Sequence, residues 1–145
     1  MIVCADEGDL DKMCILLMEM QHHDKLGMPP INPIKMQEAI RDCIQNGKVF
    51  VAKKEDDIVG ILALKKGSHW FSDGTFLGDL VFFVSPRCRK STLGSRLLRA
   101  ASQYASISRL PLLMAVVSGE DVSRKDAFYS RHGFSRIGGV FARGL

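Results

Sequence analysis

Hydrophobic residues spaced three or four positions apart predict two helices near the start of the chain. The first covers residues 9–21, where the apolar side chains fall on one face. The second begins after Asn32, a favoured capping residue that Pro33 follows, and ends at Gly47. The stretch between them, residues 24–33, is rich in proline and is expected to be a loop.

Shorter apolar runs in the middle of the chain predict three strands, at residues 48–54, 58–65 and 75–84. The first two flank a short acidic turn and should pair as an antiparallel hairpin. The third ends in five consecutive apolar residues, which is typical of a strand covered on both faces of a sheet. The polar stretch before it, residues 66–74, is expected to be a loop.

Helical and extended patterns alternate in the C-terminal half. We expect a helix at 92–106, a strand at 111–117, a helix at 123–132 and a final strand at 134–143. A strand, a crossover helix and a second strand form a right-handed parallel unit. Residues 1–145 are therefore predicted to be a single α/β (α+β) domain with one mixed, mostly antiparallel central sheet and helices on both faces.

Charge is distributed unevenly along the chain. Residues 1–84 hold 9 Lys and Arg against 13 Asp and Glu, whereas residues 85–145 hold 11 against 3. A half this basic attracts a polyanion such as a nucleic acid, a membrane surface or a phosphorylated cofactor, and the acidic half would suit a cationic acceptor. A solvated basic surface is the alternative explanation of the same charges.

No apolar stretch approaches the roughly 20 residues of a membrane span, and the first residues do not have the pattern of a signal peptide. Four scattered cysteines without a Cys-x-x-Cys pair argue against a zinc site or a disulfide framework and for a reducing compartment. We therefore expect a cytoplasmic protein that has no metal site and no membrane partner.

The segment from Val84 to Ser95 joins the third strand to the following helix and carries four basic residues in or just beyond the loop. Unpaired amides and the positive dipole end make a helix N-terminus an anion site, whereas Lys and Arg are normally disfavoured there. A bound anion would account for this placement, and a basic surface turn is the alternative. The segment has none of the glycine patterns of ordinary nucleotide and dinucleotide loops.

This segment contains the sequence Val84-x-Pro86-x-x-Arg89-x-x-x-x-Gly94, which resembles motif A of the GNAT-type N-acetyltransferases. A second sequence, Tyr129-x-x-x-Gly133-Phe134, is similar to the motif on the last helix of that family. The two motifs occur in the expected element order, and the resemblance covers nearly the whole chain. The chain is similar in particular to short bacteriophage-encoded members.

The resemblance implies an enzyme that moves an acetyl group from acetyl-CoA (coenzyme A) to a primary amine by direct attack in a ternary complex. It implies that the pantetheine lies along Phe82, Phe83 and Val84. It implies that the pyrophosphate is bound by Arg89, Lys90, Ser91, Thr92, Leu93, Gly94 and Ser95. In addition, the N–H of Val84 would stabilise the oxyanion, and Tyr129 would be the general acid that protonates the departing thiolate.

Two departures from the family pattern leave other functions open. Thr92 stands where the family prefers glycine, and residues 118–122 lack the asparagine that the family often has after the next strand. A degenerate module that binds coenzyme A and a partner without catalysis is therefore one alternative. A GNAT-like enzyme that modifies a nucleic-acid base or an aminoacyl group is another.

No base for the amine is evident other than Asp79, which could act through water as a second catalytic residue. The same carboxylate could instead be paired with a lysine at a sheet edge. His69 is a candidate for acceptor binding or catalysis. The acceptor, a small-molecule or peptide amine, is expected to contact the loops at 24–33 and 66–74. A second copy of the chain could complete the short final strand and so form a homodimer.

Overall fold

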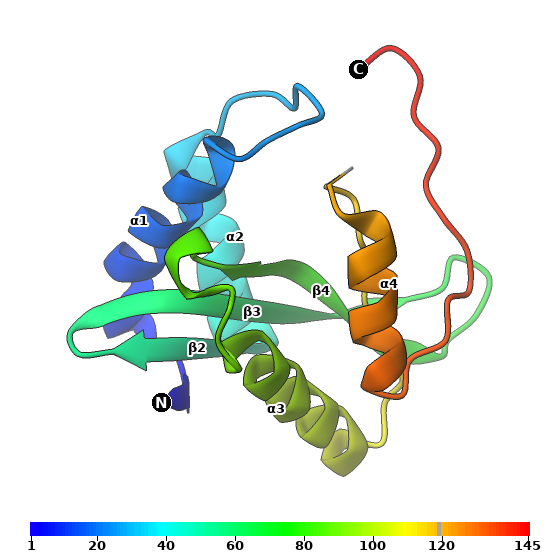
Figure 1. The fold of residues 1–145 in the computed structure, drawn as a ribbon. Helices are drawn as coiled ribbons and strands as arrows, with labels where there is room; N and C mark the ends of the chain where they lie inside the picture. Colours follow the sequence, from blue (N-terminus) through cyan, green and yellow to red (C-terminus); the bar gives the residue numbers. More distant parts are fainter. Residues whose placement is uncertain (119) are drawn as a thin grey trace.

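Five strands form one sheet in which the neighbours follow the chain order β1-β2-β3-β4-β5 (Figure 1). They are β1 (Ile2–Cys4), β2 (Lys48–Lys54), β3 (Asp57–Ser68), β4 (Thr75–Val84) and β5 (Leu112–Leu113). The first three pairings are antiparallel, and β4 pairs with β5 in parallel. The predicted mixed, mostly antiparallel sheet is therefore confirmed. This computed structural model describes residues 1–118 and 120–145.

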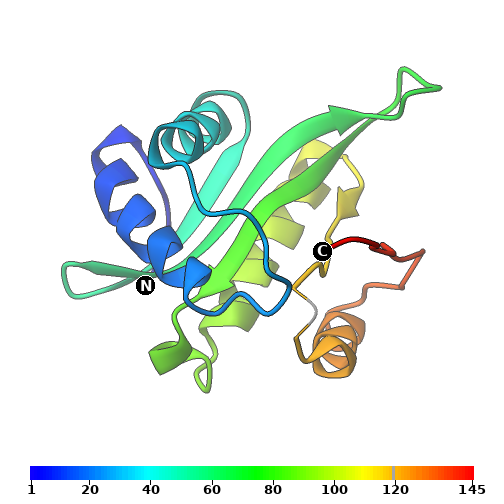
Figure 2. The same ribbon diagram turned by 90° about the horizontal axis from the view of Figure 1, so that it is seen from above.

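Helices cover both faces of the sheet, as predicted. They are α1 (Leu10–Gln21), α2 (Pro33–Asn46), α3 (Leu93–Ser108) and α4 (Val122–Arg131). Figure 2 shows α1 and α2 on one face, α3 on the other, and α4 beside the edge of the sheet. The core accordingly has two parts. Val81 and Phe83 of β4 pack on the α1 and α2 side, whereas Phe82 and Val84 pack on the α3 and α4 side.

The start of α2 follows directly from its local sequence. Oδ1 of Asn32 accepts hydrogen bonds from the amides of Ile34 and Lys35, at 3.1 and 3.2 Å. Pro33 occupies the first helical position, where the missing N–H leaves no hydrogen bond unmade. Gly47 is the C-terminal capping residue. The helix therefore has its predicted boundaries, and the loop that precedes it returns toward α1.

A β-bulge in β4 decides which side chains face which layer. Ala63 of β3 pairs with Val81, but the next residue, Leu64, pairs with Asp79, so that Leu80 is the additional residue. Leu80 and Val81 consequently both face the α1 and α2 side. Asp79, like its partner Leu64, faces the α3 and α4 side.

The chain after α4 does not form the strand predicted at 134–143. The segment makes no pairing with the sheet, and the side chain of Phe141 is 98% exposed. An ion pair of 2.8 Å between Arg136 and Asp126 holds the segment to α4. Two consecutive glycines weaken any extended structure here, and an apolar pattern is insufficient without a neighbouring strand that supplies backbone hydrogen bonds.

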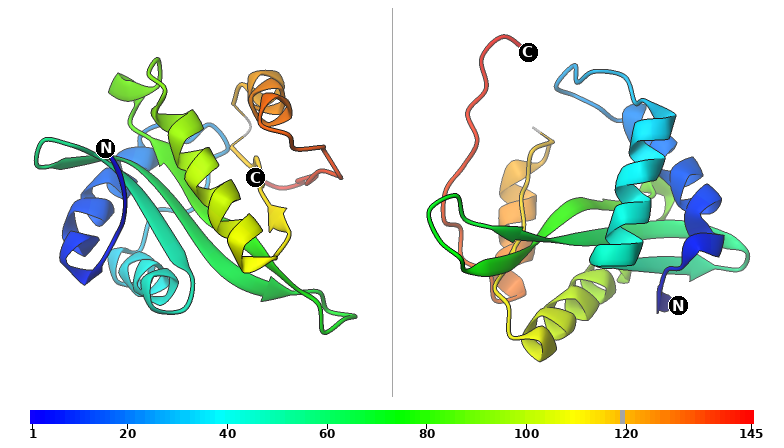
Figure 3. Two further views of the ribbon diagram at one scale, coloured as in Figure 1. Left: turned by 90° about the horizontal axis from the view of Figure 1, so that it is seen from below. Right: turned by 180° about the vertical axis from the view of Figure 1, so that it is seen from behind.

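The other differences concern the extent of the elements. The strand predicted at 111–117 is limited to Leu112–Leu113, and β1 was not predicted because three residues carry too little pattern. Strand β3 continues to Ser68, so that the predicted loop at 66–74 is shortened, and Figure 3 shows this hairpin extending beyond the sheet. The N-cap residue of helix α4 is Asp121 rather than the predicted Ser123, so that the helix begins at Val122.

Within the described part of the chain, no helix combines the length and the apolar character that a membrane span requires. The four cysteines are free thiols, and those of Cys43 and Cys88 are buried. Gly119, in the segment where the family often has its asparagine, lies outside the described residues.

Candidate functional site

The candidate site begins where β4 and β5 separate. Their pairing is confined to two residue pairs, of which the last joins Gly78 to Leu113. Beyond this pair, no strand of the described chain lies against that edge of β4. The amide of Ser85 donates to β3, and amides alternate in direction along an antiparallel strand. The N–H groups of Phe82 and Val84 therefore point to the open edge.

Asp79 lies at the point of separation. Its Oδ1 accepts a hydrogen bond of 3.0 Å from the amide of Ala115 on the diverging chain, in the place of a strand carbonyl. Burial raises the pKa of the Asp79 carboxyl, and hydrogen bonds from backbone amides offset part of this effect. Among residues 1–118 and 120–145, no lysine or arginine forms an ion pair with Asp79, so the lysine-paired alternative has no support. A carboxylate with a raised pKa is suited to accepting a proton.

Tyr129 approaches the same point from α4. Its ring packs edge-on against those of Phe128 and Phe134, with centroids 5.5 Å apart in both pairs. Gly133 permits this return of the chain because it adopts a φ of +84° at the end of α4. Burial, and to a smaller extent the charge of Asp79, raises the pKa of the Tyr129 phenol. The phenol is therefore protonated at physiological pH and can donate a hydrogen bond.

The loop between β4 and α3 is fastened from the interior. Ser85 is fully buried, and its hydroxyl donates to the carboxylate of Glu19 in α1 over 3.0 Å. Pro86 opens a short 3-10 turn that ends at the buried Cys88. The amide of Ser91 then donates to the carbonyl of Cys88 over 3.1 Å. These contacts fix the backbone that leads into α3 at the end of the open edge of β4.

Several amides at the start of α3 have no protein partner. The N-cap residue, Thr92, makes no side-chain capping bond, and the amide of Leu93 donates to the hydroxyl of Ser91 over 3.3 Å. In the described chain, no hydrogen-bond acceptor is available to the amides of Lys90, Thr92, Gly94 and Ser95. Free amides at the positive end of a helix dipole make an anion site. The anion-site prediction thus has a physical basis at four of the positions named.

Gly94 lies among these free amides without being required by the packing of the chain. A Cβ built on it would meet only the ring of Phe128, at 3.8 Å, which is an ordinary van der Waals contact. An alanine would therefore fit the protein itself. The glycine instead keeps a side chain away from the backbone beside the free amides, as a close approach by an external group requires.

Arg89 is directed to the edge of β4. Its Nε donates to the carbonyl of Val84 over 3.1 Å, and its guanidinium lies 5.4 Å from the centroid of the Phe83 ring. The side chain thus occupies part of the open edge, and its guanidinium lies over a ring of the α1 and α2 side of the sheet. Lys90 and Arg96 are exposed on either side of the free amides. The local field there is strongly positive.

Residues of α4 that sequence reasoning missed form the facing wall. Phe128 lies against Gly94 and 6.2 Å from the ring of Phe82, and Nε2 of His132 is 3.0 Å from Oγ of Ser95. The sequence did contain one indication that His132 belongs to this wall. It lies three positions after Tyr129, and residues three apart project from the same face of a helix. Helix α4 therefore contacts both the open edge of β4 and the start of α3.

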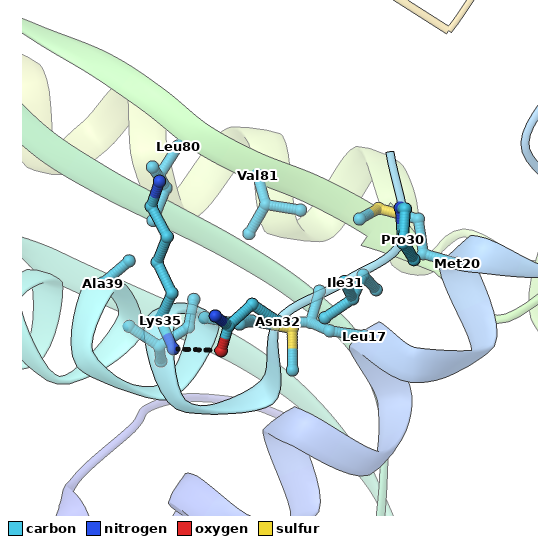
Figure 4. Close-up of a pocket in the computed structure, with 11 residues that line it drawn as sticks. Leu17, Met20, Pro30, Ile31, Asn32, Lys35, Ala39, Leu80 and Val81 are labelled. Atoms are coloured by element: carbon cyan, nitrogen blue, oxygen red, sulfur yellow. Dashed lines mark hydrogen bonds between the residues drawn. The ribbon is translucent and has the colours of Figure 1, made fainter. Parts of the chain in front are cut away.

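A pocket of about 510 Å³ lies on the other face of β4 (Figure 4). It is bounded by α1, α2, the end of the 24–33 loop and the bulge of β4. Its polar members are Asn32 and Lys35, whereas most of its surface is apolar and comes from Leu17, Met20, Ile31, Met36, Ile40, Leu80 and Val81. The predicted contribution of the 24–33 loop is thus consistent with a pocket beside the bulge.

His69 and the 66–74 segment lie apart from this pocket. None of these residues lines it, and the ring of His69 stacks on Phe71 and contacts Phe76, with centroid distances of 5.3 and 4.9 Å. The segment forms the tip of the β3–β4 hairpin, where Trp70 is 96% exposed. Within the described residues, no group of three or more His, Cys, Asp or Glu side chains could hold a metal ion.

The family model described as acetyltransferase (GNAT) domain matches residues 45–136 of the chain. This range includes the open edge of β4, the start of α3 and Tyr129 on α4. No curated protein matches the chain in sequence.

Solved acetyltransferase structures have the same fold. An aminoglycoside acetyltransferase from an uncultured soil sample, in complex with sisomicin, has 17% identity and a TM-score of 0.71, covering 100% of this chain and 95% of its own. A GNAT family acetyltransferase from Staphylococcus aureus has 16% identity and a TM-score of 0.67, covering 100% and 98%. The aminoglycoside 6'-N-acetyltransferase of Acinetobacter haemolyticus has 14% identity and a TM-score of 0.70, covering 100% and 99%. Identities this low establish a common fold and leave the acceptor open.

Proposed function

The chain belongs to the GNAT acetyltransferase family, and on this basis we propose that it transfers the acetyl group of acetyl-CoA to a primary amine of a small molecule. One observation carries the proposal. The open edge of β4 runs directly into free, positively surrounded amides at the start of α3, with Asp79 and Tyr129 at its other end. A long ligand that has an anionic middle and a reactive end would use all of these features at once.

The residues present fit coenzyme A. The amides of Lys90, Thr92, Gly94 and Ser95 would bind the pyrophosphate, and the hydroxyl groups of Ser91 and Thr92 lie in the same turn. Thr92 stands where the family motif has glycine, and its side chain makes no capping hydrogen bond, so that the backbone amide of Thr92 stays free. The N–H group of Phe82 at the open edge would pair with the pantetheine as a missing strand would, which leaves the N–H of Val84 free for the acyl group.

Acetyl-CoA supplies the acyl thioester when it is bound. The main contribution of the protein is alignment, which is worth roughly 7–11 kcal/mol of barrier when two reactants are held in attack geometry. The N–H of Val84 would donate to the acyl oxygen as negative charge develops on it in the transition state. The rings of Phe82 and Phe128, with centroids 6.2 Å apart, would give the bound thioester partly apolar surroundings, in which such a hydrogen bond is stronger.

Asp79 and Tyr129 would divide the proton transfers between them. The Asp79 carboxylate, with its raised pKa, would take the proton that the amine loses through water. The Tyr129 phenol donates to the sulfur that leaves. Because the charge of Asp79 raises the pKa of Tyr129, protonation of Asp79 removes that effect and makes the phenol a better acid as the sulfur departs.

Titration with acetyl-CoA tests the cofactor assignment. Binding to the folded state should raise the melting temperature, with a stabilisation of about 2.7 kcal/mol at 100 times Kd. Release of free coenzyme A should then depend on an added amine. A melting temperature unchanged at millimolar acetyl-CoA would contradict the proposal. Binding without release from any amine would instead favour a binding module.

A further inference from the structure

The pocket on the α1 and α2 side of β4 has a chemistry that selects among amines. Asp79 and Val81 are two positions apart and would share a face of a regular strand, yet the bulge turns them to opposite faces. An acceptor in the pocket therefore lies next to the point where the acetyl group would be held, separated from it by the open edge of β4. This argument rests on the proposed function.

The charge of the pocket disfavours a polycationic acceptor. Among the described residues that line it there is no aspartate or glutamate, and Lys35 is the one charged side chain. In the described chain, no carboxylate forms an ion pair with Lys35. An aminoglycoside carries several ammonium groups, which would be desolvated here against apolar walls and a like charge. The fold shared with aminoglycoside acetyltransferases therefore does not imply an aminoglycoside as the acceptor.

The position of Lys35 specifies an anionic group instead. Figure 4 shows its side chain extending from α2 toward Leu80. Its backbone amide is already bound to Asn32 Oδ1 in the helix cap, at 3.2 Å, which fixes the root of the side chain. The ammonium thus lies at the end of the pocket nearest the bulge. A carboxylate bound there would be adjacent to the place where the amine must react.

The rest of the pocket fits an apolar side chain. Leu17 and Ile40 are almost fully buried at its base, at 2% and 1% exposure, and Val81 forms the wall on β4. A pocket of about 510 Å³ falls in the range of small-molecule sites. Methionines at positions 20 and 36 add a surface that adapts to different apolar shapes.

We infer that the acceptor is an α-amino acid with a large apolar side chain. Its carboxylate pairs with the Lys35 ammonium, its side chain occupies the apolar pocket, and its α-amine faces the open edge of β4 beside Asp79. In the transfer, the amine nitrogen forms the new bond to the acyl carbon while the carbon–sulfur bond breaks. The amine proton goes to Asp79 and the thiolate receives a proton from Tyr129, so that the products are an N-acetyl amino acid and free thiol.

The experiment compares matched amines by the rate of coenzyme A release. Phenylalanine, methionine and leucine should react with a kcat/KM at least roughly tenfold above that of phenethylamine. Phenethylamine is phenylalanine without its carboxylate. The substitution Lys35→Met should raise the KM for phenylalanine about tenfold or more and leave phenethylamine unchanged. Lys65→Met, at an exposed lysine that does not line the pocket, should change neither.

A second variant tests the apolar part of the site. Ala39 lines the pocket on α2, and Ala39→Phe should shift the preference from phenylalanine toward alanine without altering the response to acetyl-CoA. Binding of phenylalanine, measured calorimetrically in the presence of coenzyme A, should weaken in both Lys35→Met and Ala39→Phe.

The outcomes separate this inference from the proposed function. Acetyl-CoA binding with faster acetylation of sisomicin or kanamycin than of any apolar amino acid would overturn the inference and leave the acetyltransferase proposal intact. An equal effect of Lys35→Met on phenylalanine and phenethylamine would also overturn it. Failure of acetyl-CoA to bind would remove both.

Discussion

Gly94 offers the sharpest test of the cofactor site, because the same substitution should affect stability and binding in opposite directions. Replacing it with alanine places a Cβ 3.8 Å from the ring of Phe128, a contact that costs the folded protein nothing. Alanine is favoured over glycine in helices by about 0.5–1 kcal/mol. The free protein should therefore be more stable, by roughly 1–4 °C in melting temperature for a chain of this size.

Binding of acetyl-CoA should weaken in the same variant. The added methyl group lies on the Phe128 side of the segment that carries the free amides of Gly94 and Ser95, where we expect it to hinder the approach of a phosphate. Loss of one hydrogen bond to a charged group costs about 1.5–3 kcal/mol, which corresponds to a Kd roughly 10- to 150-fold higher. At a ligand concentration of 100 times the original Kd, a tenfold weaker Kd reduces the stabilisation from about 2.7 to about 1.4 kcal/mol.

Differential scanning fluorimetry with and without acetyl-CoA measures both effects in one experiment. Ser106→Ala is the matched control, because Ser106 is exposed on α3 and distant in sequence from the free amides. It should stabilise the helix and leave the ligand-induced shift unchanged. If Gly94→Ala kept the original Kd within a factor of two, the reasoning that this glycine leaves room for a phosphate would be refuted.

Three further substitutions test the proton transfers and one ion pair. Tyr129→Phe should lower kcat by roughly 10²–10⁴-fold with an unchanged thermal shift by acetyl-CoA, and a wild-type rate would rule out the acid role. Asp79→Asn keeps an oxygen for the Ala115 amide but cannot accept a proton. The wild-type rate should fall at low pH as the Asp79 carboxylate, whose pKa is raised by burial, becomes protonated. The pH–rate profile of the variant should not show this acidic fall. If the variant kept it, the titrating group would be a residue other than Asp79. The ion pair of 2.7 Å between Asp9 and Lys53 lowers the pKa of the Asp9 carboxyl. The pair therefore stabilises the fold above the unfolded-state pKa of about 3.9. This contribution is lost as the pH falls through the lower pKa of the folded state. Asp9→Asn should therefore reduce unfolding free energy by about 1 kcal/mol at neutral pH, with a difference that disappears in acid, and a pH-independent difference would contradict this cause.

Local sequence was sufficient wherever the cause of an element is itself local. The cap at Asn32, the stop at Gly47 and the turn at Gly133 depend on the backbone preferences of single residues, and the structure has all three where they were predicted. The alternating and continuous apolar runs of the middle strands specify which residues are buried. The order of the elements from α1 to α4 and the fold class followed from these patterns, whereas β1 was not predicted and the predicted last strand does not form.

Pairing between distant segments could not be obtained in this way. The apolar pattern at 134–143 is compatible with a strand, yet a strand exists only if a neighbour offers its free amides and carbonyls, and the chain instead remains attached to α4 through Arg136. The strand predicted at 111–117 is shortened for a related reason. The side chain of Asp79 accepts the hydrogen bond of the Ala115 amide, and β4 and β5 separate at that point.

The sequence by itself determined a GNAT-like order of elements, a basic loop before a helix and a tyrosine on the last helix. Only the tertiary structure decided that the bulge at Leu80 turns Asp79 toward Tyr129 while Val81 faces an apolar pocket with Lys35 at its end. The physical reason is that a bulge is a mismatch between two strands, so that neither strand encodes it alone. The proposed donor site follows from local motifs, whereas the pocket proposed for the acceptor is a product of the packing of α1, α2 and β4.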